Sequence, residues 1–488
     1  MEVLTSADLA ADFTLDNRGR RIFIKGVGLV GVGLLAGTLG GCDKLAEAIR
    51  NRPVRHRLRT GSAEVDAAID LYRQAVTQMK MLGAGDPRSW TAQATIHGTP
   101  AGFNFCQHGT NHFFDWHRAY LFYFEKICQK LTGNSKFGLP YWNWNQDVAI
   151  HPAFLDPTST LFLARNRTSM AGSSSITTPA LDPILGDTNF FTFSQQVEGT
   201  PHNNVHTYIG GTLGGFTSAL DPLFWMHHCM VDYCWAKWNL ELDNDNTNDQ
   251  TWIGTDDSHF VDADGNPASA TAGVTTLMPL LSYRYESSAI GSSPAQAEIT
   301  MTKSQYKKLE SRIRKGADVR FDIKRRVRLA ERTAVSIARP LSVDTRSSAA
   351  EVASIVESDS SREVVFASIE YAQLPATSDF SVRVFVNLPG ADANTPSEDP
   401  HYAGSFAFFG TEPSGPGVEH RLQPKFLVNL TPTLQRLRAR QELTPTGAIS
   451  VQLVPTPFAG GFEKADTELV LNGIDIIVTP VTVRAKTG

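Results

Sequence analysis

The stretch HFFDWHRAYLFYFEKICQKL, residues 112–131, indicates the fold of the first half of the chain. It is strongly apolar, which is typical of a helix buried inside a protein core. Gly133 follows it as a stop signal. The overlapping segment CQHGTNHFFDWHR, residues 106–118, contains one cysteine and three histidines. We therefore expect a buried helix that presents imidazole groups to the interior.

Other helical patterns flank this one. Residues 63–82 carry apolar side chains at helical spacing. A second block covers about 196–209, and a third covers about 221–240, where Asp221 and Pro222 supply a cap and a first turn. Residues 139–145 read as an aromatic loop and 150–195 as a polar loop. The first half is therefore expected to be a mainly α domain with a helical-bundle core.

The histidines of this region form two groups. The first comprises His97, His108, His112 and His117, and the second comprises His202, His206, His227 and His228. HNNVH, residues 202–206, places two imidazoles on one helix face. Asp232 follows one turn after His228, where a carboxylate can accept the free N–H of a ligand imidazole. Helices that face one another across a bundle are a common scaffold for metal sites.

The donor types narrow the choice of metal. Neither group has a carboxylate at a ligand spacing. A dinuclear zinc hydrolase is expected to carry bridging carboxylates, whereas imidazole also suits copper. Two neighbouring all-histidine sites thus favour a pair of copper ions that handles dioxygen.

The second half of the chain changes its period. Segments such as VRVFVNL (382–388), ISVQLV (449–454) and LVLNGIDIIV (469–478) read as strands, and the last contains an Asn-Gly turn candidate. We expect a separate antiparallel β-sandwich over 362–482. Residues 286–361 are interpreted as a linker, because 303–332 hold twelve Lys or Arg against four acids. That composition suits a solvated linker better than a nucleic-acid surface.

Residues 1–42 are interpreted as an export segment. Arg20 and Arg21 precede a glycine-rich apolar run that is short for a membrane span, which is typical of a twin-arginine signal. LGGC at 39–42 is similar to a bacterial lipoprotein cleavage box, so Cys42 is a candidate lipid anchor. The sequence predicts a periplasmic or extracellular protein, with membrane anchoring as an open alternative. A net charge of −5 gives no reason to expect a nucleic-acid partner.

The motifs resemble those of a known family. VRHRLR (54–59), CQHGTNHFFDWHRAYLFYFEKI (106–127), FGLPYWNWN (137–145), EGTPHNNVH (198–206) and DPLFWMHHCMVDYCWAKW (221–238) are similar to type 3 copper proteins, which include tyrosinases, catechol oxidases and hemocyanin units. The resemblance covers about 50–285, a tyrosinase-like catalytic domain. HYAGSFAFFG (401–410) resembles the C-terminal domain of plant polyphenol oxidases, and YRY (283–285) resembles the tyrosine motif that closes their catalytic core.

The resemblance implies a ligand set. The first copper would be held by His97, His108 and His117, and the second by His202, His206 and His228. His227 would then be a neighbour of the second site, and His112 falls on no ligand position. A cysteine placed as Cys106 forms a thioether to the ligand histidine, here His108, in some relatives.

The resemblance also implies roles around the second copper. Glu198 and Asn203 stand where a glutamate and an asparagine hold a water that acts as base toward a phenol. The position of a bulky gate residue falls on Gly215 or the adjacent Phe216. The C-terminal domain is expected to shield the site, which makes the chain a latent precursor.

The implied activity is that of a copper oxidoreductase. It would oxidise o-diphenols to o-quinones with dioxygen and also hydroxylate monophenols, as tyrosinases do. Catechol oxidation alone and o-aminophenol oxidation remain open, and a hemocyanin-like oxygen carrier is a weaker alternative. Phenolic small molecules and dioxygen are the expected partners, and the sequence does not indicate an oligomeric state.

Overall fold

The structure is a computed structural model of the 488-residue chain. It describes residues 51–247, 249–295, 325–330, 333–336, 341–344, 363–410, 423–443, 449–458 and 468–480. The chain divides into two compact units. Unit 1 takes its described residues from Met1–Gly98, Phe103–Leu163 and Ala219–Arg320, and unit 2 takes them from Thr99–Gly102, Ala164–Ser218 and Phe321–Gly488.

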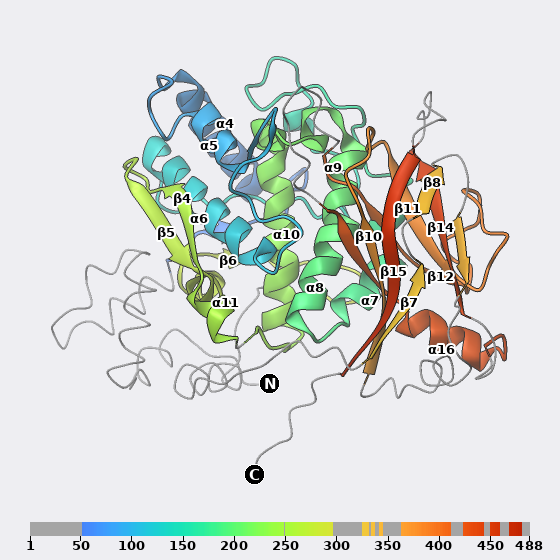
Figure 1. Ribbon diagram of the computed structural model, residues 1–488. Helices are drawn as coiled ribbons and strands as arrows, with labels where there is room; N and C mark the ends of the chain where they lie inside the picture. Colours follow the sequence, from blue (N-terminus) through green and yellow to red (C-terminus); the bar gives the residue numbers. More distant parts are fainter. Residues whose placement is uncertain are drawn as a thin grey trace, which may run out of the picture. The chain divides into compact units, whose positions relative to one another are not determined.

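Unit 1 is built on helices. They are α4 (Ala63–Met81), α5 (Trp90–His97), α6 (Phe113–Thr132), α10 (Pro222–Leu240), α11 (Gln250–Gly254), α12 (Ala272–Thr275) and α13 (Met278–Leu281), with the 3₁₀ turn η1 (Pro152–Phe154). Helix α6 packs against α4, α10 and α12 (Figure 1). No helix among the described residues is long and apolar enough to cross a membrane.

The two longest core helices begin and end as their sequences predict. The side chain of Asp221 caps α10 by accepting a hydrogen bond from the Leu223 amide at 2.8 Å, and Pro222 occupies the first turn. Helix α6 ends at Gly133, whose φ of 67° is the left-handed conformation that glycine adopts without strain. Both helices are buried around almost their whole circumference, which explains their nearly continuous apolar sequence.

Short strands complete unit 1. β1 (Val54–Arg55) pairs in parallel with β6 (Arg284–Tyr285), so the two ends of the predicted catalytic region meet in one ladder. β4 (Asp256–Val261) and β5 (Pro267–Thr271) form an antiparallel hairpin beside α6. A further short pairing joins β2 (Gly98–Thr99) and β3 (Gly102–Phe103).

The helical part of unit 2 contains His202 and His206 of the second histidine group. It contains η2 (Ser174–Ile176), α7 (Thr178–Leu185), α8 (Phe190–Val197), the π-helical turn η3 (Glu198–His202), α9 (Asn203–Ile209) and the 3₁₀ turn η4 (Gly211–Gly214). The short turn η5 (Ser218–Leu220) begins at Ser218, the last residue of the segment Ala164–Ser218. The prediction of a loop over 150–195 is therefore wrong for α7 and most of α8. Pro179 and Pro183 hid α7, because proline in a short segment reads as a breaker.

Unit 2 also contains two antiparallel sheets. The strands are β7 (Arg325–Ala330), β8 (Thr333–Ser336), β9 (Leu341–Asp344), β10 (Glu363–Tyr371), β11 (Phe380–Val386), β12 (Tyr402–Ala407), β13 (Lys425–Asn429), β14 (Ser450–Pro457) and β15 (Glu468–Pro480). One sheet has the order β13-β10-β15-β7, with β8 also paired to β15, and the other has β12-β11-β14-β9. This confirms the predicted antiparallel β architecture.

Two details differ from the sequence-based expectation. The predicted linker 286–361 contains β7, β8 and β9, which pair with β15 and β14. Alternating arginines on β7 hid it, because Arg326 and Arg328 face outward and bond to Asp475. The Asn-Gly pair at 472–473 makes no hairpin: β15 continues through it, and the register shifts there against β10.

Side chains of the two sheets meet in an aromatic core. Phe406 of β12 stacks on Phe426 of β13 with 4.1 Å between ring centroids, and Tyr371 of β10 meets Phe408 edge-on at 4.9 Å. Contacts of this kind between facing sheets define a β-sandwich. Helices α8 and α9 pack against strands β13, β12 and β11 of the same unit (Figure 1).

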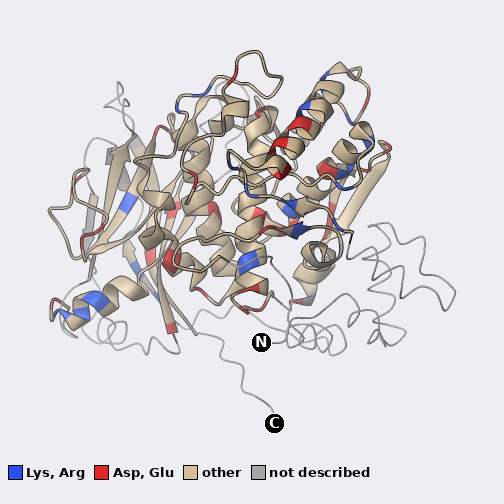
Figure 2. Ribbon diagram, turned by 180° about the vertical axis from the view of Figure 1, so that it is seen from behind, with Lys and Arg blue, Asp and Glu red and all other residues tan. Residues whose placement is uncertain are grey.

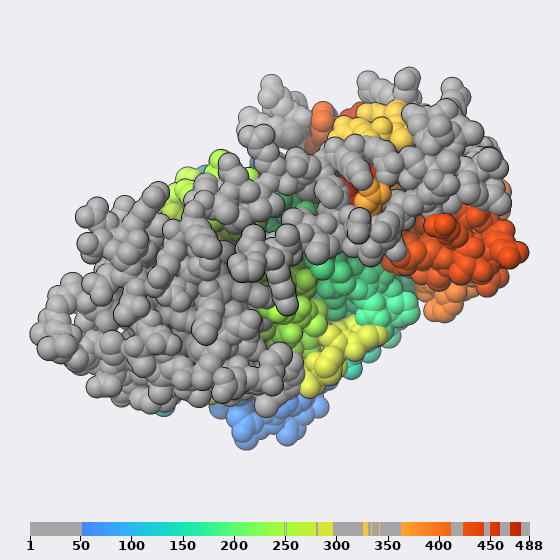
Figure 3. All heavy atoms as spheres, turned by 90° about the horizontal axis from the view of Figure 1, so that it is seen from below, coloured from blue at the N-terminus to red at the C-terminus, as the bar shows by residue number. Residues whose placement is uncertain are grey.

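Helix α16 (Thr431–Ala439) covers part of the sandwich. Leu434 and Leu437 face inward, and the Thr433 hydroxyl donates a hydrogen bond to the Tyr402 carbonyl at 2.8 Å. Arg436 and Arg438 lie in the last turn, where positive charge complements the helix dipole. Figure 2 colours the ribbon blue at Lys and Arg and red at Asp and Glu. The outer face of α16 forms part of the orange-red surface in Figure 3.

Candidate metal centre

Unit 1 brings the first predicted ligand set together. His97 is the last residue of α5, His108 lies in the loop before α6, and His117 lies in the first turns of α6. The Nε2 atoms of His97 and His108 are 3.2 Å apart. The His117 ring lies 5.8 Å from that of His97 and 5.0 Å from that of His108, between centroids. Three imidazoles from separate segments thus converge on one point.

Neighbouring groups fix the orientation of these rings. His117 Nδ1 donates to the Phe113 carbonyl at 2.7 Å, so its Nε2 is the nitrogen that can bind a metal. Phe103 stacks on His108 at 4.3 Å, and Phe224 meets His97 edge-on at 4.9 Å. The rings are therefore held in an apolar, aromatic environment that favours neutral imidazole.

Cys106 lies at the same cluster. Its sulfur and donor nitrogens of His97 and His108 are all within 4.8 Å of one another. The thiol is half-buried, whereas Cys128, Cys229 and Cys234 are buried. The sulfur therefore lies close to the His108 ring, which is a precondition for the proposed thioether bond.

The histidine pair on α10 divides into two environments. Trp144 Nε1 donates to His227 Nδ1 at 3.2 Å, so the neutral His227 ring carries its proton on Nε2. The His228 ring instead stacks on His117 at 4.6 Å and 17°, and its donor atom clusters with those of His97 and His117. The choice of His228 over His227 as the ligand stays a prediction.

His112 is bonded to one member of a buried pair of carboxyl groups, Asp115 and Asp257. Its Nδ1 is 2.8 Å from Asp115 Oδ2, and its ring is parallel to that of Trp252. Asp115 is hydrogen-bonded in turn to Asp257 of β4. Burial and the neighbouring carboxylate raise the pKa of Asp257 to about 9, and burial also raises the pKa of Asp115. Sequence patterns gave no signal for this pair, because its members are far apart in the chain.

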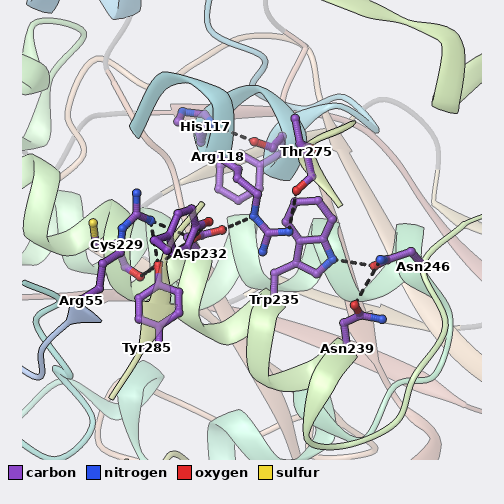
Figure 4. A network of polar contacts seen from close by, with 12 residues as sticks. Arg55, His117, Arg118, Cys229, Asp232, Trp235, Asn239, Asn246, Thr275 and Tyr285 are labelled. Carbon is purple, nitrogen blue, oxygen red and sulfur yellow. Dashed lines mark hydrogen bonds and ion pairs between the residues drawn. The ribbon is translucent and has the colours of Figure 1, made fainter. Parts of the chain in front are cut away.

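Asp232 has a different role from the one expected (Figure 4). Its carboxylate accepts hydrogen bonds from Arg55 at 3.0 Å, from Tyr283 at 2.5 Å and from Tyr285 at 2.6 Å, and also from Arg118. No hydrogen bond joins it to a ligand imidazole, so that prediction is wrong. The arginines and tyrosines hold the pKa of Asp232 below its ordinary value although burial alone would raise it.

This network fastens four segments of unit 1 together. Arg55 of β1 also binds Glu125 of α6 at 2.9 Å, and its guanidinium lies 3.6 Å above the Tyr283 ring. The segments VRHRLR and YRY therefore meet at one buried carboxylate. The sequence marked both segments by resemblance alone, and the network supplies the physical reason for their residue types.

Unit 2 contains the other predicted pair, His202 and His206. The rings are 4.6 Å apart at 72°. His202 Nδ1 donates a hydrogen bond to Asn203 Oδ1 at 2.8 Å, and His206 Nδ1 donates one to the Leu213 carbonyl at 2.7 Å. In both rings Nε2 is therefore the nitrogen whose lone pair can bind a metal. Burial lowers the pKa of His202 to about 3, which keeps the ring neutral. The third predicted ligand, His228, belongs to unit 1.

Glu198 and Asn203 frame this pair. Glu198 begins the π-helical turn and Asn203 begins α9, and both side chains are buried. Pro201 lacks an amide hydrogen, which suits the break from α-helical bonding at this turn. Asn203 Nδ2 donates to the Ala407 carbonyl of β12 at 2.9 Å. The amide thus bridges a candidate ligand and the sandwich.

Aromatic side chains cover the second pair. Phe409, just after β12, stacks on His206 at 4.0 Å and 24° and meets His202 edge-on at 5.4 Å. Of the two gate candidates, Phe216 is buried against Gly410, where an added Cβ would lie 2.6 Å from the ring. At Gly215 an added Cβ would make only an ordinary contact, 3.9 Å from the Thr212 carbonyl oxygen. The sequence marked 401–410 only by resemblance and did not single out Phe409.

The donor chemistry fits copper. The clusters described in unit 1 contain imidazole and thiol donors and no carboxylate. Two buried histidines in unit 2, His202 and His206, offer the same donor type. Imidazole sets without carboxylate suit copper better than a bridged dinuclear zinc site.

Known proteins are similar to this chain in sequence. The family model described as the common central domain of tyrosinase matches residues 87–177 and 162–241. A tyrosinase from Hahella sp. (strain CCB-MM4) is 31% identical over 284 residues, which are 45% of this chain and 61% of that protein. A latent polyphenol oxidase, chloroplastic, from Prunus armeniaca is 26% identical over 472 residues, covering 84% of this chain and 73% of that protein. The match thus spans less than two thirds of the Hahella protein.

Solved structures share the fold. A latent aurone synthase (polyphenol oxidase) aligns over 88% of this chain and 91% of its own, with a TM-score of 0.61 and 20% identity. Latent apple tyrosinase aligns over 88% and 97%, with a TM-score of 0.59 and 20% identity. Tyrosinases use two copper ions, for which the histidine clusters offer ligands. Residues 87–241 thus match the common central domain of tyrosinase, and the chain as a whole is similar to tyrosinases and polyphenol oxidases.

Proposed function

We propose that the protein is a copper-dependent phenol oxidase that converts o-diphenols to o-quinones and hydroxylates monophenols, with dioxygen as the oxidant. The observation that carries this proposal is the convergence of His97, His108 and His117 in an apolar setting of a chain that is similar to tyrosinases. When bound, two copper ions supply the redox chemistry between the phenol and dioxygen. The protein supplies the ligands, their orientation and the surroundings.

We assign His97, His108 and His117 to the first copper, and His202, His206 and His228 to the second. The assignment of the first set is supported by the geometry of unit 1. The assignment of the second rests on the family correspondence and on the Nδ1 bonds of His202 and His206. His227 stays outside the set, because Trp144 bonds to its Nδ1.

Glu198 is the proposed acceptor for the phenol proton. Its side chain is buried, and it begins the π-helical turn that ends at His202, where a carboxylate can act on a bound water or on the phenol hydroxyl. Asn203 would orient that acceptor through its amide. Support for this step comes from the position of both residues at the second histidine pair.

Oxygen uptake tests the proposal. The protein is loaded with copper, its metal content is measured, and uptake is followed on a monophenol and on its matching o-diphenol. Uptake with both, after a lag on the monophenol, is the expected result. Uptake with the diphenol alone would mean catechol oxidase, and faster uptake with an o-aminophenol would mean aminophenol oxidase.

Two outcomes would overturn the proposal. Reversible oxygen binding without phenol turnover would mean an oxygen carrier. Tight binding of zinc in place of copper, with hydrolytic activity, would mean a hydrolase. The buried imidazole clusters without carboxylate argue against the second outcome.

The sandwich is proposed to keep the enzyme latent. Phe409 covers the faces of His202 and His206, and Asn203 is bonded to Ala407. Thr200 adds a hydrogen bond from its hydroxyl to the Ser405 carbonyl at 2.7 Å. Strand β12 lies at the edge of its sheet, so Thr200 and Asn203 occupy alternate carbonyls of that edge. A phenol cannot approach the histidine pair while these contacts persist.

Activation would require a cut before the sandwich begins. A cut near 340–360 falls after β7 and β8 and within or beyond β9, so strands that pair in the sheets would stay on the catalytic fragment. A protease site placed within 296–324, outside the described residues, separates the complete sandwich from unit 1 instead. Higher oxygen uptake after that cut is expected. Equal uptake before and after the cut would refute latency.

Export is proposed from the sequence. Residues 1–42 lie outside the described residues, and the proposal rests on Arg20, Arg21 and the apolar run that follows. Lipidation at Cys42 would add a membrane anchor. The mass of the mature N-terminal peptide separates the two forms, and replacing both arginines with lysine is expected to abolish export through the twin-arginine route.

A further inference from the structure

A stacked ring pair on the surface of unit 1 lies directly beside the Cys106 loop. The rings of Phe105 and His259 are parallel within 7°, with 3.7 Å between centroids. Phe105 is the residue before Cys106 and is 36% exposed, and His259 is also exposed. An exposed pair with this geometry needs an explanation other than core packing.

His259 is held in an uncommon backbone conformation. Its φ is 74°, in the left-handed region that residues other than glycine rarely adopt. It lies in a β-bulge of β4, where the register against β5 shifts between Asp257 and Phe260. Such conformations persist where the surroundings enforce them, and they concentrate at functional sites.

The bulge in β4 contacts both helix α6, which contains His117, and the loop that contains Cys106. Phe260 points inward and packs on Trp116 of α6 at 5.5 Å between centroids. The residue before it, His259, faces outward toward Phe105. The bulge therefore allows one strand to anchor in the core and to hold the loop from outside.

The start of the loop is fastened to its neighbours in unit 1. Phe105 and Asn104 donate backbone hydrogen bonds to Ile96 at 3.2 Å and to His97 at 2.9 Å, which fasten the start of the loop to α5. Phe103 stacks on the far side of His108. The stack of Phe105 on His259 adds a side-chain contact at the residue directly before Cys106.

We infer that His259 is a positioning residue which, through its stack on Phe105, holds Cys106 against His108. The inference rests on the proposed copper site, because the juxtaposition matters for thioether formation. In that step the S–H bond of Cys106 and a ring C–H bond of His108 break, and an S–C bond forms. The two electrons and two protons pass to dioxygen, which leaves as hydrogen peroxide.

The first test uses copper-free protein and does not depend on the activity. The alkylation rate of Cys106 by iodoacetamide is measured by peptide mass mapping in wild-type protein and in His259→Asn. Asparagine tolerates the left-handed backbone but lacks the ring. The rate is expected to rise about fivefold, as the loss of one aromatic contact implies. An unchanged rate would overturn the inference.

Matched variants separate stacking from general loosening. Ser258→Ala changes the exposed neighbour in the same bulge and should leave the rate unchanged. Phe105→Leu should raise the rate as His259→Asn does, and the double variant should add nothing further. His259→Tyr restores a ring and should return the rate toward the wild-type value. Additive effects in the double variant would contradict the stack.

The second readout is the crosslink itself. After copper loading in air, the thioether peptide of the wild-type protein is expected to be lighter by two hydrogen atoms. His259→Asn should form it about fivefold more slowly. If the wild-type protein forms no crosslink, the thioether proposal fails, while the alkylation result still decides the role of His259.

Discussion

The ring of Phe409 lies parallel to that of His206, 4.0 Å away, and closes one face of the second histidine pair. Replacing Phe409 by Leu should open this face. We expect oxygen uptake by the uncut, copper-loaded chain to increase several-fold, because the phenol no longer has to displace the sandwich. Phe408→Leu is the matched control, since Phe408 packs on Tyr371 within the sandwich core. If both variants increase oxygen uptake equally, the effect comes from a general loosening of the sandwich and not from removal of the Phe409 ring.

Glu198→Gln tests the proton acceptor. The amide keeps the shape but cannot accept a proton at neutral pH. Hydroxylation of the monophenol should fall by about 10²–10⁴-fold, the range for loss of a general base. Oxidation of the matching diphenol is the internal control and should change much less. A parallel loss of both activities would show that Glu198 supports the site and has no specific role toward monophenols.

Asp232→Asn tests the buried network. It leaves Arg55 and Arg118 without their shared counter-charge, and loss of one partner from a buried ion pair costs about 3–5 kcal/mol. The free energy of unfolding, measured with urea, should fall by that amount. Asp264→Asn is the control, because its ion pair with Lys130 is exposed and contributes about 0–1 kcal/mol. Equal losses for the two variants would contradict the role assigned to Asp232.

The carboxyl pair predicts a pH dependence of stability. The folded pKa of Asp257, about 9, lies above its ordinary value of 3.8, so the folded state binds a proton that the unfolded state loses. This stabilising contribution is complete below pH 4 and disappears as the pH rises toward 9. Asp257→Asn keeps a neutral side chain at all pH values.

Urea unfolding at several pH values between 5 and 9 provides the measurement. The stability of the wild-type protein relative to Asp257→Asn should decrease as the pH rises. Asp264→Asn, at an exposed carboxylate that pairs with Lys130, is the control and should leave the slope unchanged. A wild-type slope equal to that of Asp257→Asn would mean that the carboxyl pair does not titrate in this range.

The sequence by itself determined the local elements and the donor set. Apolar periodicity, the Asp221 cap and the Gly133 stop predict α10 and α6 correctly, because these signals act within a few residues. The family motifs predict which histidines converge in unit 1. Strands with an apolar alternation were also recognised, whereas charged β7 and proline-containing α7 were not.

Only the tertiary structure decided which distant residues meet. Asp232 binds Arg55 and Tyr283, Asp115 is hydrogen-bonded to Asp257, and Phe409 lies on His206. Each pairing joins segments that are far apart in the chain, and its energy comes from burial, which local patterns do not encode. The sequence therefore specifies the ligands, and the packing of the chain specifies what orients and covers them.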